Sequence, residues 1–252
     1  LSPIHDRAAY VALARDMAGM GVHSITIKDM AGIMGPREAY DLVSALKDAV
    51  ALPVIVHTHS TTGLGLLTYQ KAVEAGADVI DTAISCFSGG TSQPPTETLV
   101  YAFRQEGYSV DLDDSRLKKI NDFFKSIRAD ALESGLLNPL VLSTDTDALI
   151  YQVPGGMLSN LVAQLTAQNK MDRLDAVLAE VPRVREDLGY PPLVTPMSQM
   201  VGVQATANVL VGERWKRVSN EVKSYVRGEY GKAPGPIHPE IRRLILGDEQ
   251  PI

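Results

Sequence analysis

Residues 53–63 read Pro-Val-Ile-Val-His-Thr-His-Ser-Thr-Thr-Gly, and they set the architecture that we predict for the rest of the chain. The consecutive apolar residues Val54–Val56 are typical of a short strand in a parallel sheet that is covered on both faces. His57 and His59 follow two residues apart, so their side chains point to the same side of the strand. Ligands of parallel α/β folds bind at this carboxyl end, where two neutral imidazoles suit a divalent transition metal. The alternative is a pair of hydrogen-bonding histidines without a metal.

The segments around residues 53–63 repeat one pattern, a short apolar strand followed by a loop and an amphipathic helix. Repeats of about thirty residues of this kind build parallel sheets. They predict an α/β fold, and they favour part of a (β/α)8 barrel over an open sheet. Three strands cannot close an eight-stranded barrel, so either the missing strands precede Leu1 or the fold is a different one. We expect the first. Strands are predicted at 24–28, 53–57 and 78–84, and helices at 6–20, 37–49, 63–75 and 96–105.

The composition is that of an ordinary globular protein and excludes several functional classes. The 252 residues carry a formal net charge of -6, which argues against a nucleic-acid surface. The single cysteine, Cys86, rules out an intrachain disulfide and agrees with a cytoplasmic location. No apolar run is long enough to cross a bilayer, and no basic-then-apolar leader is present, so we expect no membrane insertion. Because the chain begins at Leu1 rather than methionine, we expect it to be a piece of a longer protein.

Three predicted strands end in residues that can carry chemistry. These are Lys28, then His57 with His59, then the loop 88–93. Neighbouring strands lie about 4.8 Å apart, so Lys28 can reach the histidines. A neutral lysine amine can add carbon dioxide to form a carbamate, which is anionic and binds metals as a carboxylate does. The alternative is a surface lysine or one that is ion-paired, for example with Asp29.

The chain after residue 105 is predicted to consist of helices and loops. An amphipathic helix is expected at 113–134, with its apolar side chains Leu117, Ile120, Phe123, Phe124 and Ile127 packed inward. Further helices are expected at 161–188. Their charged residues are predicted to form a solvated face: Arg183, Arg185, Glu186 and Asp187.

Five motifs, in order along essentially the whole chain, resemble the carboxyltransferase domain of biotin-dependent enzymes. This group includes pyruvate carboxylase, with its separate B subunit in two-subunit forms, the α-subunit of oxaloacetate decarboxylase, and transcarboxylase. The motifs are Ile-Lys-Asp-Met-Ala-Gly (27–32), His-Thr-His-Ser-Thr-Thr-Gly (57–63), Gly-Thr-Ser-Gln-Pro-Pro (90–95), Gln-Val-Pro-Gly-Gly-Met-Leu-Ser-Asn-Leu (152–161) and Leu-Val-Thr-Pro-Met-Ser-Gln-Met-Val-Gly (193–202).

The resemblance implies a (β/α)8 barrel followed by a mostly helical funnel region, with the C-terminal half of the barrel at 1–108 and the helical carboxylase extension at 109–252. It also implies a metal bound by carbamylated Lys28 with His57 and His59. In the family, the threonine that matches Thr91 shuttles a proton between biotin and the methyl carbon of pyruvate. Thr91 and Lys28 are therefore the expected catalytic residues, and Thr91 and Gln93 the expected substrate-binding residues. A further aspartate ligand, and an arginine and a glutamine that hold the keto acid, belong to early strands that this chain does not show.

The implied reaction is transfer of a carboxyl group between carboxybiotin and a 2-oxo acid, pyruvate or oxaloacetate, through a metal-stabilised enolate. The expected cofactors are a divalent metal (Zn, Mn or Co) and biotin. No Ala-Met-Lys-Met biotinylation motif is present in the chain, so biotin is expected on a separate carrier domain or subunit. A homodimer within a larger carboxylase complex is the expected assembly.

Two other functions fit parts of the pattern. The first is a metal-dependent lyase or aldolase of the same barrel superfamily, which shares the two histidines but lacks Lys28. The second is a non-catalytic fragment that folds only with its missing N-terminal strands. A three-stranded parallel sheet leaves an open edge, so we predict that this chain alone is unstable.

Overall fold

The computed structural model describes residues 3–247 and residue 249, and it divides the chain into two compact units. The first unit, Arg7–Ile150, contains all the described strands. The second comprises Tyr151–Ile252 together with the first six residues, and its described elements are helices.

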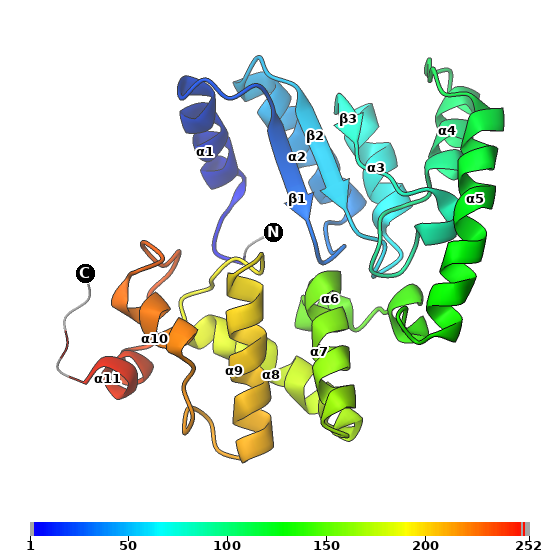
Figure 1. The fold of residues 1–252 in the computed structure, drawn as a ribbon. Coiled ribbons are helices and arrows are strands. Elements are labelled where there is room, and N and C mark those ends of the chain that lie inside the picture. The colour runs from blue at the N-terminus through cyan, green and yellow to red at the C-terminus, as the bar shows by residue number, and fades with distance from the viewer. Residues whose placement is uncertain (1–2, 248, 250–252) are drawn as a thin grey trace. The chain divides into compact units, whose positions relative to one another are not determined.

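Strands and helices alternate in the unit Arg7–Ile150, as the sequence predicted (Figure 1). Its β/α part contains α1 (Arg7–Gly19), β1 (Ile25–Asp29), α2 (Pro36–Ala49), β2 (Val54–Thr58), α3 (Gly65–Glu74), β3 (Val79–Ile80), the 3-10 turn η1 (Ser85–Phe87) and α4 (Thr96–Gln105). The chain continues through α5 (Asp114–Glu133), the 3-10 turn η2 (Pro139–Leu142) and the short α6 (Ala148–Tyr151) at the end of the unit.

The strands form one three-stranded parallel sheet in the order β1-β2-β3. In its register Lys28 pairs with His57, so the two expected site residues lie side by side on neighbouring strands. The third strand is much shorter than the predicted 78–84, because the backbone at Ala83 turns away. Its amide donates to the carbonyl of Pro94 at 3.0 Å, and its carbonyl accepts from the amide of Thr96 at 2.8 Å.

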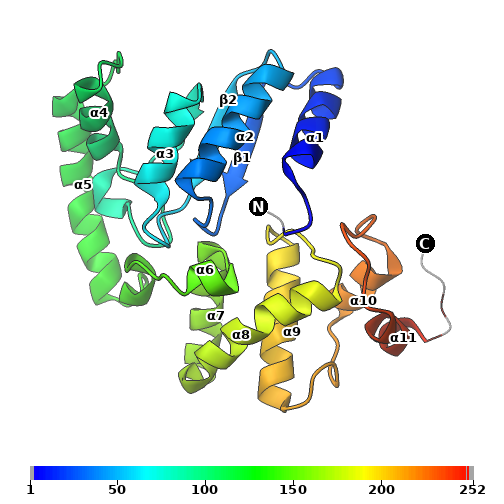
Figure 2. The same ribbon diagram turned by 180° about the vertical axis from the view of Figure 1, so that it is seen from behind.

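In the unit Arg7–Ile150 the helices lie on one face of the sheet, and Figure 2 shows α2 and α3 in front of the strands, with α1 to the side. On the covered face the apolar side chains of Ile25, Ile27, Val54 and Val56 are buried against these helices. The expectation that β2 is covered on both faces is not met within this unit, since Ile55 is only half-buried and Val79 of the neighbouring β3 is 46% exposed. The unit Arg7–Ile150 is thus an α/β fold with a small parallel sheet, one face of which its own helices leave uncovered.

The helix α2 shows why these segments fold locally as they do. Its apolar residues recur at helical spacing, and the side chains of Ala39, Leu42, Val43 and Leu46 are buried. Pro36 occupies the first turn, where no backbone amide is needed. The carboxylate of Glu38 accepts the amide of Gly35 at 3.0 Å, which satisfies a donor at the helix start.

The helix α5 contradicts the prediction that its apolar face packs inward. Phe123 is 66% exposed, and Ile120 and Ile127 are also exposed. The inward side of the helix is instead set by Phe124, whose ring contacts that of Phe87 with the centroids 5.7 Å apart. Because apolar residues lie on more than one side of α5, the sequence pattern alone does not show which side packs against the neighbouring segment.

The unit Tyr151–Ile252 is built from helices around a separate apolar core. Its longer helices, α7 (Gly155–Ala167), α8 (Leu174–Asp187) and α9 (Met197–Val211), contribute most of the fully buried side chains, among them Leu161, Leu165, Val177, Val181, Val184 and Val201. The 3-10 turn η3 (Met171–Arg173) precedes α8, and α10 (Asn220–Arg227) and α11 (Pro239–Leu246) complete the unit. Among the described residues, no helix has the length and apolarity needed to span a membrane.

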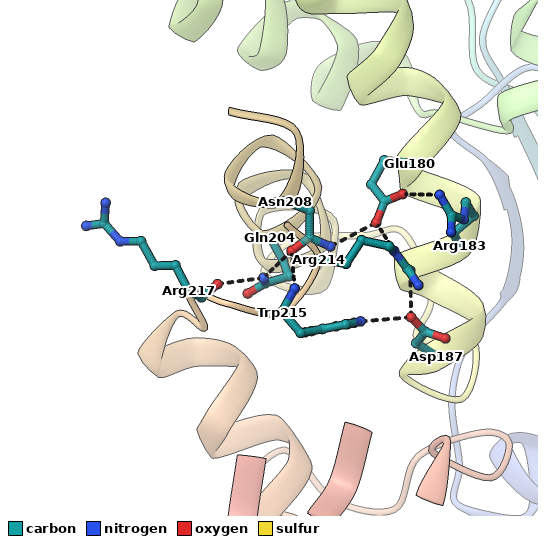
Figure 3. A network of polar contacts seen from close by, with 8 residues as sticks. All are labelled: Glu180, Arg183, Asp187, Gln204, Asn208, Arg214, Trp215 and Arg217. Carbon is teal, nitrogen blue, oxygen red and sulfur yellow. Dashed lines mark hydrogen bonds and ion pairs between the residues drawn. The ribbon is translucent and has the colours of Figure 1, made fainter. Parts of the chain in front are cut away.

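A polar network joins α8 to α9 and to the segment that follows α9 (Figure 3). Its centre is Glu180, whose side chain is only 5% exposed and whose carboxylate accepts hydrogen bonds from Arg183, Asn208 and Arg214 at 3.0, 2.8 and 2.6 Å. Asp187 accepts from Arg214 at 2.7 Å and from the indole of Trp215 at 3.0 Å. These contacts cross-link segments that are far apart in the sequence.

The network corrects the prediction of a solvated charged face on α8. Arg183 and Glu186 are exposed, but Arg185 is buried and donates to the carbonyl of Pro191 at 3.2 Å. Asp187 is largely enclosed through its contacts with Arg214 and Trp215. Charged side chains of a buried helix can therefore be enclosed when residues from another segment form hydrogen bonds or ion pairs with them.

Candidate metal centre

The candidate site lies at the carboxyl ends of β1 and β2, on the uncovered face of the sheet. Side chains alternate between the two faces, and the burial pattern puts Lys28 and His57 on the side opposite to the helices. His59 follows one residue after β2 ends at Thr58, and its amide donates to the carbonyl of Asp29 at 3.1 Å. This hydrogen bond fixes the backbone of His59 to the end of the neighbouring strand.

The two imidazoles converge, as the spacing predicted. His57 Nε2 and His59 Nε2 lie 3.1 Å apart. Nδ1 of His59 contacts the carbonyl oxygen of Thr91 at 2.5 Å, and Nδ1 of His57 contacts a carboxylate oxygen of Asp81 at 2.9 Å. Both oxygens can only accept, so both Nδ1 atoms carry the proton. The two Nε2 atoms therefore present lone pairs to each other, a contact that is favourable only with a proton or a cation between them.

The loop 88–93 after the third strand comes to the same place. Besides the Thr91 carbonyl, the side-chain amide of Gln93 donates to His59 Nε2 at 3.3 Å. This is the contact expected of a nitrogen with a free lone pair. The structure therefore brings together His57, His59, Thr91 and Gln93 around one point, with Lys28 on the adjacent strand.

Burial lowers the pKa of His59, and the neighbouring His57 and Lys28 act in the same direction. The hydrogen bond to Thr91 and the charge of Asp29 act in the opposite direction, but burial is the largest effect. A lowered pKa keeps this imidazole neutral near pH 7, which is the form that binds metals.

Asp29 has a structural role on the opposite face of the sheet. It is 1% exposed, and its carboxylate accepts the amides of Ile33 and Met34 and the hydroxyl of Thr58 at 3.2, 2.8 and 2.8 Å. It thereby holds the turn that follows β1. Since Lys28 points to the uncovered face, the alternative of a Lys28–Asp29 ion pair does not describe this structure. The other alternative, a surface lysine, agrees with it, because the Lys28 side chain is exposed.

Sequence reasoning missed two residues that support the site, Asp81 and Tyr69. Asp81 follows β3 directly, so its position after a strand was a usable signal. Tyr69, in α3, is fully buried beneath the sheet. Its hydroxyl accepts the amide of Thr58 at 3.0 Å and donates to the carbonyl of Asp81. One phenol thus ties together the ends of β2 and β3, and no sequence pattern marked this helical tyrosine.

The donor set fits a transition metal if Lys28 supplies an anionic oxygen. Among the described residues, no group of three or more histidine, cysteine, aspartate or glutamate side chains is placed to hold a metal ion. The chain offers two imidazole nitrogens, each with its other ring nitrogen hydrogen-bonded to an oxygen. That arrangement is typical of histidine ligands.

Gly90 fixes the position of the Thr91 carbonyl, and we predict that Gly90→Ala destabilises the protein. Gly90 has a φ of +52°, and a Cβ atom there would lie 2.3 Å from the backbone oxygen of Val141. That oxygen accepts the Thr91 amide at 2.9 Å, so the two segments cannot separate freely. We expect a loss of about 2 kcal/mol in the free energy of unfolding, measured by urea denaturation.

The matched control is Gly89→Ala. Gly89 also has a positive φ, +87°, but a Cβ atom there would meet nothing within 4 Å. It reports backbone strain without a steric clash, so its cost should be clearly smaller. Equal costs for the two variants would show that the contact with Val141 does not constrain the loop.

Two family models match successive parts of the chain. One, described as HMGL-like, matches residues 4–124, and the other, described as a conserved carboxylase domain, matches residues 148–252.

Curated relatives match over the full chain. The B subunit of pyruvate carboxylase from Methanothermobacter thermautotrophicus is 52% identical over 100% of this chain and 44% of that protein. The methylmalonyl-CoA carboxyltransferase 5S subunit of Propionibacterium freudenreichii is 45% identical over 97% of this chain and 48% of that protein. The chain therefore spans less than half the length of these relatives.

Solved structures agree with the sequence matches. The carboxyl transferase domain of Rhizobium etli pyruvate carboxylase with pyruvate superposes with a TM-score of 0.89 and 29% identity, over 99% of this chain and 43% of that one. The structure of the complete multifunctional enzyme from the same organism gives a TM-score of 0.89 at 28% identity, over 99% of this chain and 25% of that one.

Proposed function

We propose that this chain, a member of the carboxyltransferase family of biotin-dependent enzymes, carries the C-terminal part of a (β/α)8 barrel at 1–108 and a helical extension at 109–252 that forms a funnel. The uncovered sheet face supports the proposal. A parallel strand that is half-exposed on one side fits the wall of a barrel whose other strands are elsewhere. Near the carboxyl ends of β1 and β2 this face presents Lys28 and His57, which are charged or metal-binding residues.

We infer that the whole protein moves a carboxyl group between carboxybiotin and a 2-oxo acid such as pyruvate or oxaloacetate. The observation that carries this is the convergence of the His57 and His59 Nε2 atoms, 3.1 Å apart, beside Lys28. The relatives include the B subunit of a pyruvate carboxylase and the large subunit of a 2-oxoglutarate carboxylase, so the proposal is made for 2-oxo acids as a class.

The proposed roles follow from the positions of the side chains. His57, His59 and carbamylated Lys28 would hold a divalent metal (Zn, Mn or Co), which when bound supplies Lewis-acid polarisation of the keto acid. The carbonyl of Thr91 orients His59, and its hydroxyl is proposed to move a proton between biotin and the acid. The side-chain amide of Gln93 donates a hydrogen bond to His59 Nε2 in this structure. It could instead donate to a carboxylate or carbonyl oxygen of the bound 2-oxo acid.

We propose that biotin arrives on a separate carrier domain or subunit, and that the enzyme acts as a homodimer within a larger carboxylase complex. Two relatives are themselves named as single subunits of a pyruvate carboxylase, which supports a multi-subunit assembly. A cytoplasmic location is proposed from the single cysteine, Cys86.

Bound metal tests the proposed function most directly. We expect the full-length protein to contain about one divalent metal per chain by elemental mass spectrometry, since one site is proposed, and to decarboxylate oxaloacetate when free biotin is added. The double variant His57→Ala/His59→Ala should lose both properties. Stoichiometric metal that persists in the double variant would place the metal elsewhere, and a metal-free active enzyme would refute the proposal.

Thr91→Ala separates the two roles proposed for this residue. The main-chain carbonyl remains in the variant, so bound metal should stay unchanged. Loss of the hydroxyl should lower kcat for oxaloacetate decarboxylation by about a hundredfold, a typical contribution of a proton-transfer group. Thr91→Ser keeps the hydroxyl and should retain most of the activity. If Thr91→Ala is as active as the unchanged enzyme, only the carbonyl of Thr91 contributes.

A further inference from the structure

Asp81 lies directly after β3, at the rim of the uncovered sheet face. One of its carboxylate oxygens is 2.9 Å from His57 Nδ1, and its side chain is 48% exposed. Its backbone is held at both peptide groups. The amide donates to the carbonyl of Val56 at 3.0 Å, and the carbonyl accepts the hydroxyl of the buried Tyr69. The carboxylate therefore extends from a fixed point toward His57.

The two histidines are held by partners of different kinds. His59 Nδ1 donates to a peptide carbonyl, that of Thr91, whose place in the loop is fixed by the contact with Val141. His57 Nδ1 depends instead on the side chain of Asp81, which follows the neighbouring strand β3. A neutral imidazole in water prefers the tautomer with the proton on Nε2, and this proton would occupy the nitrogen that faces His59. Something must therefore favour the other tautomer of His57.

We propose that Asp81 is a positioning residue of the metal centre, which holds the Nδ1–H tautomer of His57 and so keeps its Nε2 lone pair directed at the point shared with His59. This inference rests on the metal-dependent function proposed above and adds a residue to it. A carboxylate that accepts the second ring proton of a histidine ligand both orients the ring and raises its basicity.

Asp81 is not a candidate ligand in this arrangement. Nδ1 and Nε2 lie on different sides of the imidazole ring, and the carboxylate contacts the Nδ1 side, whereas His59 Nε2 lies 3.1 Å from the other nitrogen. The carboxylate therefore acts through His57 and does not approach the shared point itself.

The test replaces Asp81 with alanine in the full-length protein and uses two measurements. In the metal-free protein, heteronuclear NMR of the imidazole nitrogens should show the proton of His57 moving from Nδ1 to Nε2. In bicarbonate buffer, which maintains the proposed Lys28 carbamate, calorimetric titration with Zn²⁺ alone should show at least an approximately tenfold rise in Kd. Circular dichroism should show that the variant folds, because the side chain is half-exposed.

The matched control is Asp78→Ala, the same change just before β3. Its carboxylate accepts from Lys47 and from the amide of Val54, which begins β2, whereas His57 lies near the carboxyl end of that strand. The variant should therefore leave the His57 tautomer and the Zn²⁺ affinity unchanged. The proposal is overturned if Asp81→Ala leaves either the tautomer or the Kd as it was. A protein that binds no Zn²⁺ before any substitution would refute the proposed function instead, and the metal-free NMR would still report whether Asp81 sets the tautomer.

Discussion

Lys28→Ala is expected to strip the metal from the full-length protein and to reduce its activity about a thousandfold. The two imidazoles alone give an incomplete and uncharged ligand set, so the loss of the anionic carbamate should weaken metal binding by at least about a hundredfold. The metal is proposed to supply several kcal/mol of stabilisation in the transition state, and about 1.4 kcal/mol corresponds to a factor of ten in rate. Metal content and the initial rate of oxaloacetate decarboxylation measure the two effects separately.

Chemical rescue distinguishes a lost ligand from a structural defect in the Lys28→Ala variant. Formate or acetate can supply the missing anionic oxygen in the space that the lysine side chain leaves, and should restore part of the metal and the activity. Lys71→Ala is the control, because Lys71 is an α3 residue whose ion pair with Glu74 lies on the surface. Unchanged metal content in Lys28→Ala would remove the carbamate from the proposed centre.

Glu180→Ala is expected to destabilise the helical unit by about 3 kcal/mol. The substitution leaves the half-buried guanidinium of Arg214 with one of its two carboxylate partners, and it leaves the side-chain amide of Asn208 without its acceptor. Breaking a buried pair costs about 3–5 kcal/mol, and we take the lower end because the Arg214 side chain is 33% exposed. Hydrogen exchange of the amides in α8, α9 and α10 should then become about a hundredfold faster.

Glu186→Ala provides the control for Glu180→Ala, since Glu186 is an exposed glutamate on the same helix. It should change stability by no more than about 0.5 kcal/mol. Equal exchange rates in the two variants would mean that the network of Figure 3 contributes no net stability, as happens when desolvation cancels the attraction of buried charges.

Short-range patterns predicted the features of the fold that local geometry determines. Alternation between strand and helix, the two-residue spacing of His57 and His59, and the position of Lys28 at a strand end all follow from the period of a strand. The parallel register of β1 and β2 then places Lys28 beside His57. These features depend on the strand itself and on its immediate neighbour.

Features that depend on a distant partner could not be predicted in this way. Asp81 acquires its role only through the sheet order, and the inward turn of Asp187 requires Arg214 and Trp215 from a later segment. The third strand ends early because Ala83 pairs with the segment around Pro94. In α5, apolar residues occur on two sides of the helix, so the sequence alone does not determine which side packs. The contact between the rings of Phe87 and Phe124 determines it in the structure.

The three-stranded sheet also bears on how the chain behaves in a cell. In the part of the chain that the structure describes, β1 and β3 are outer strands, and each presents backbone donors and acceptors on its free side. Such an edge, beside a face without a covering layer, is a template to which other chains can add strands. Heterologous production of residues 1–252 alone would therefore favour inclusion bodies, and co-production with a segment that supplies the next strands would favour recovery from the clarified lysate.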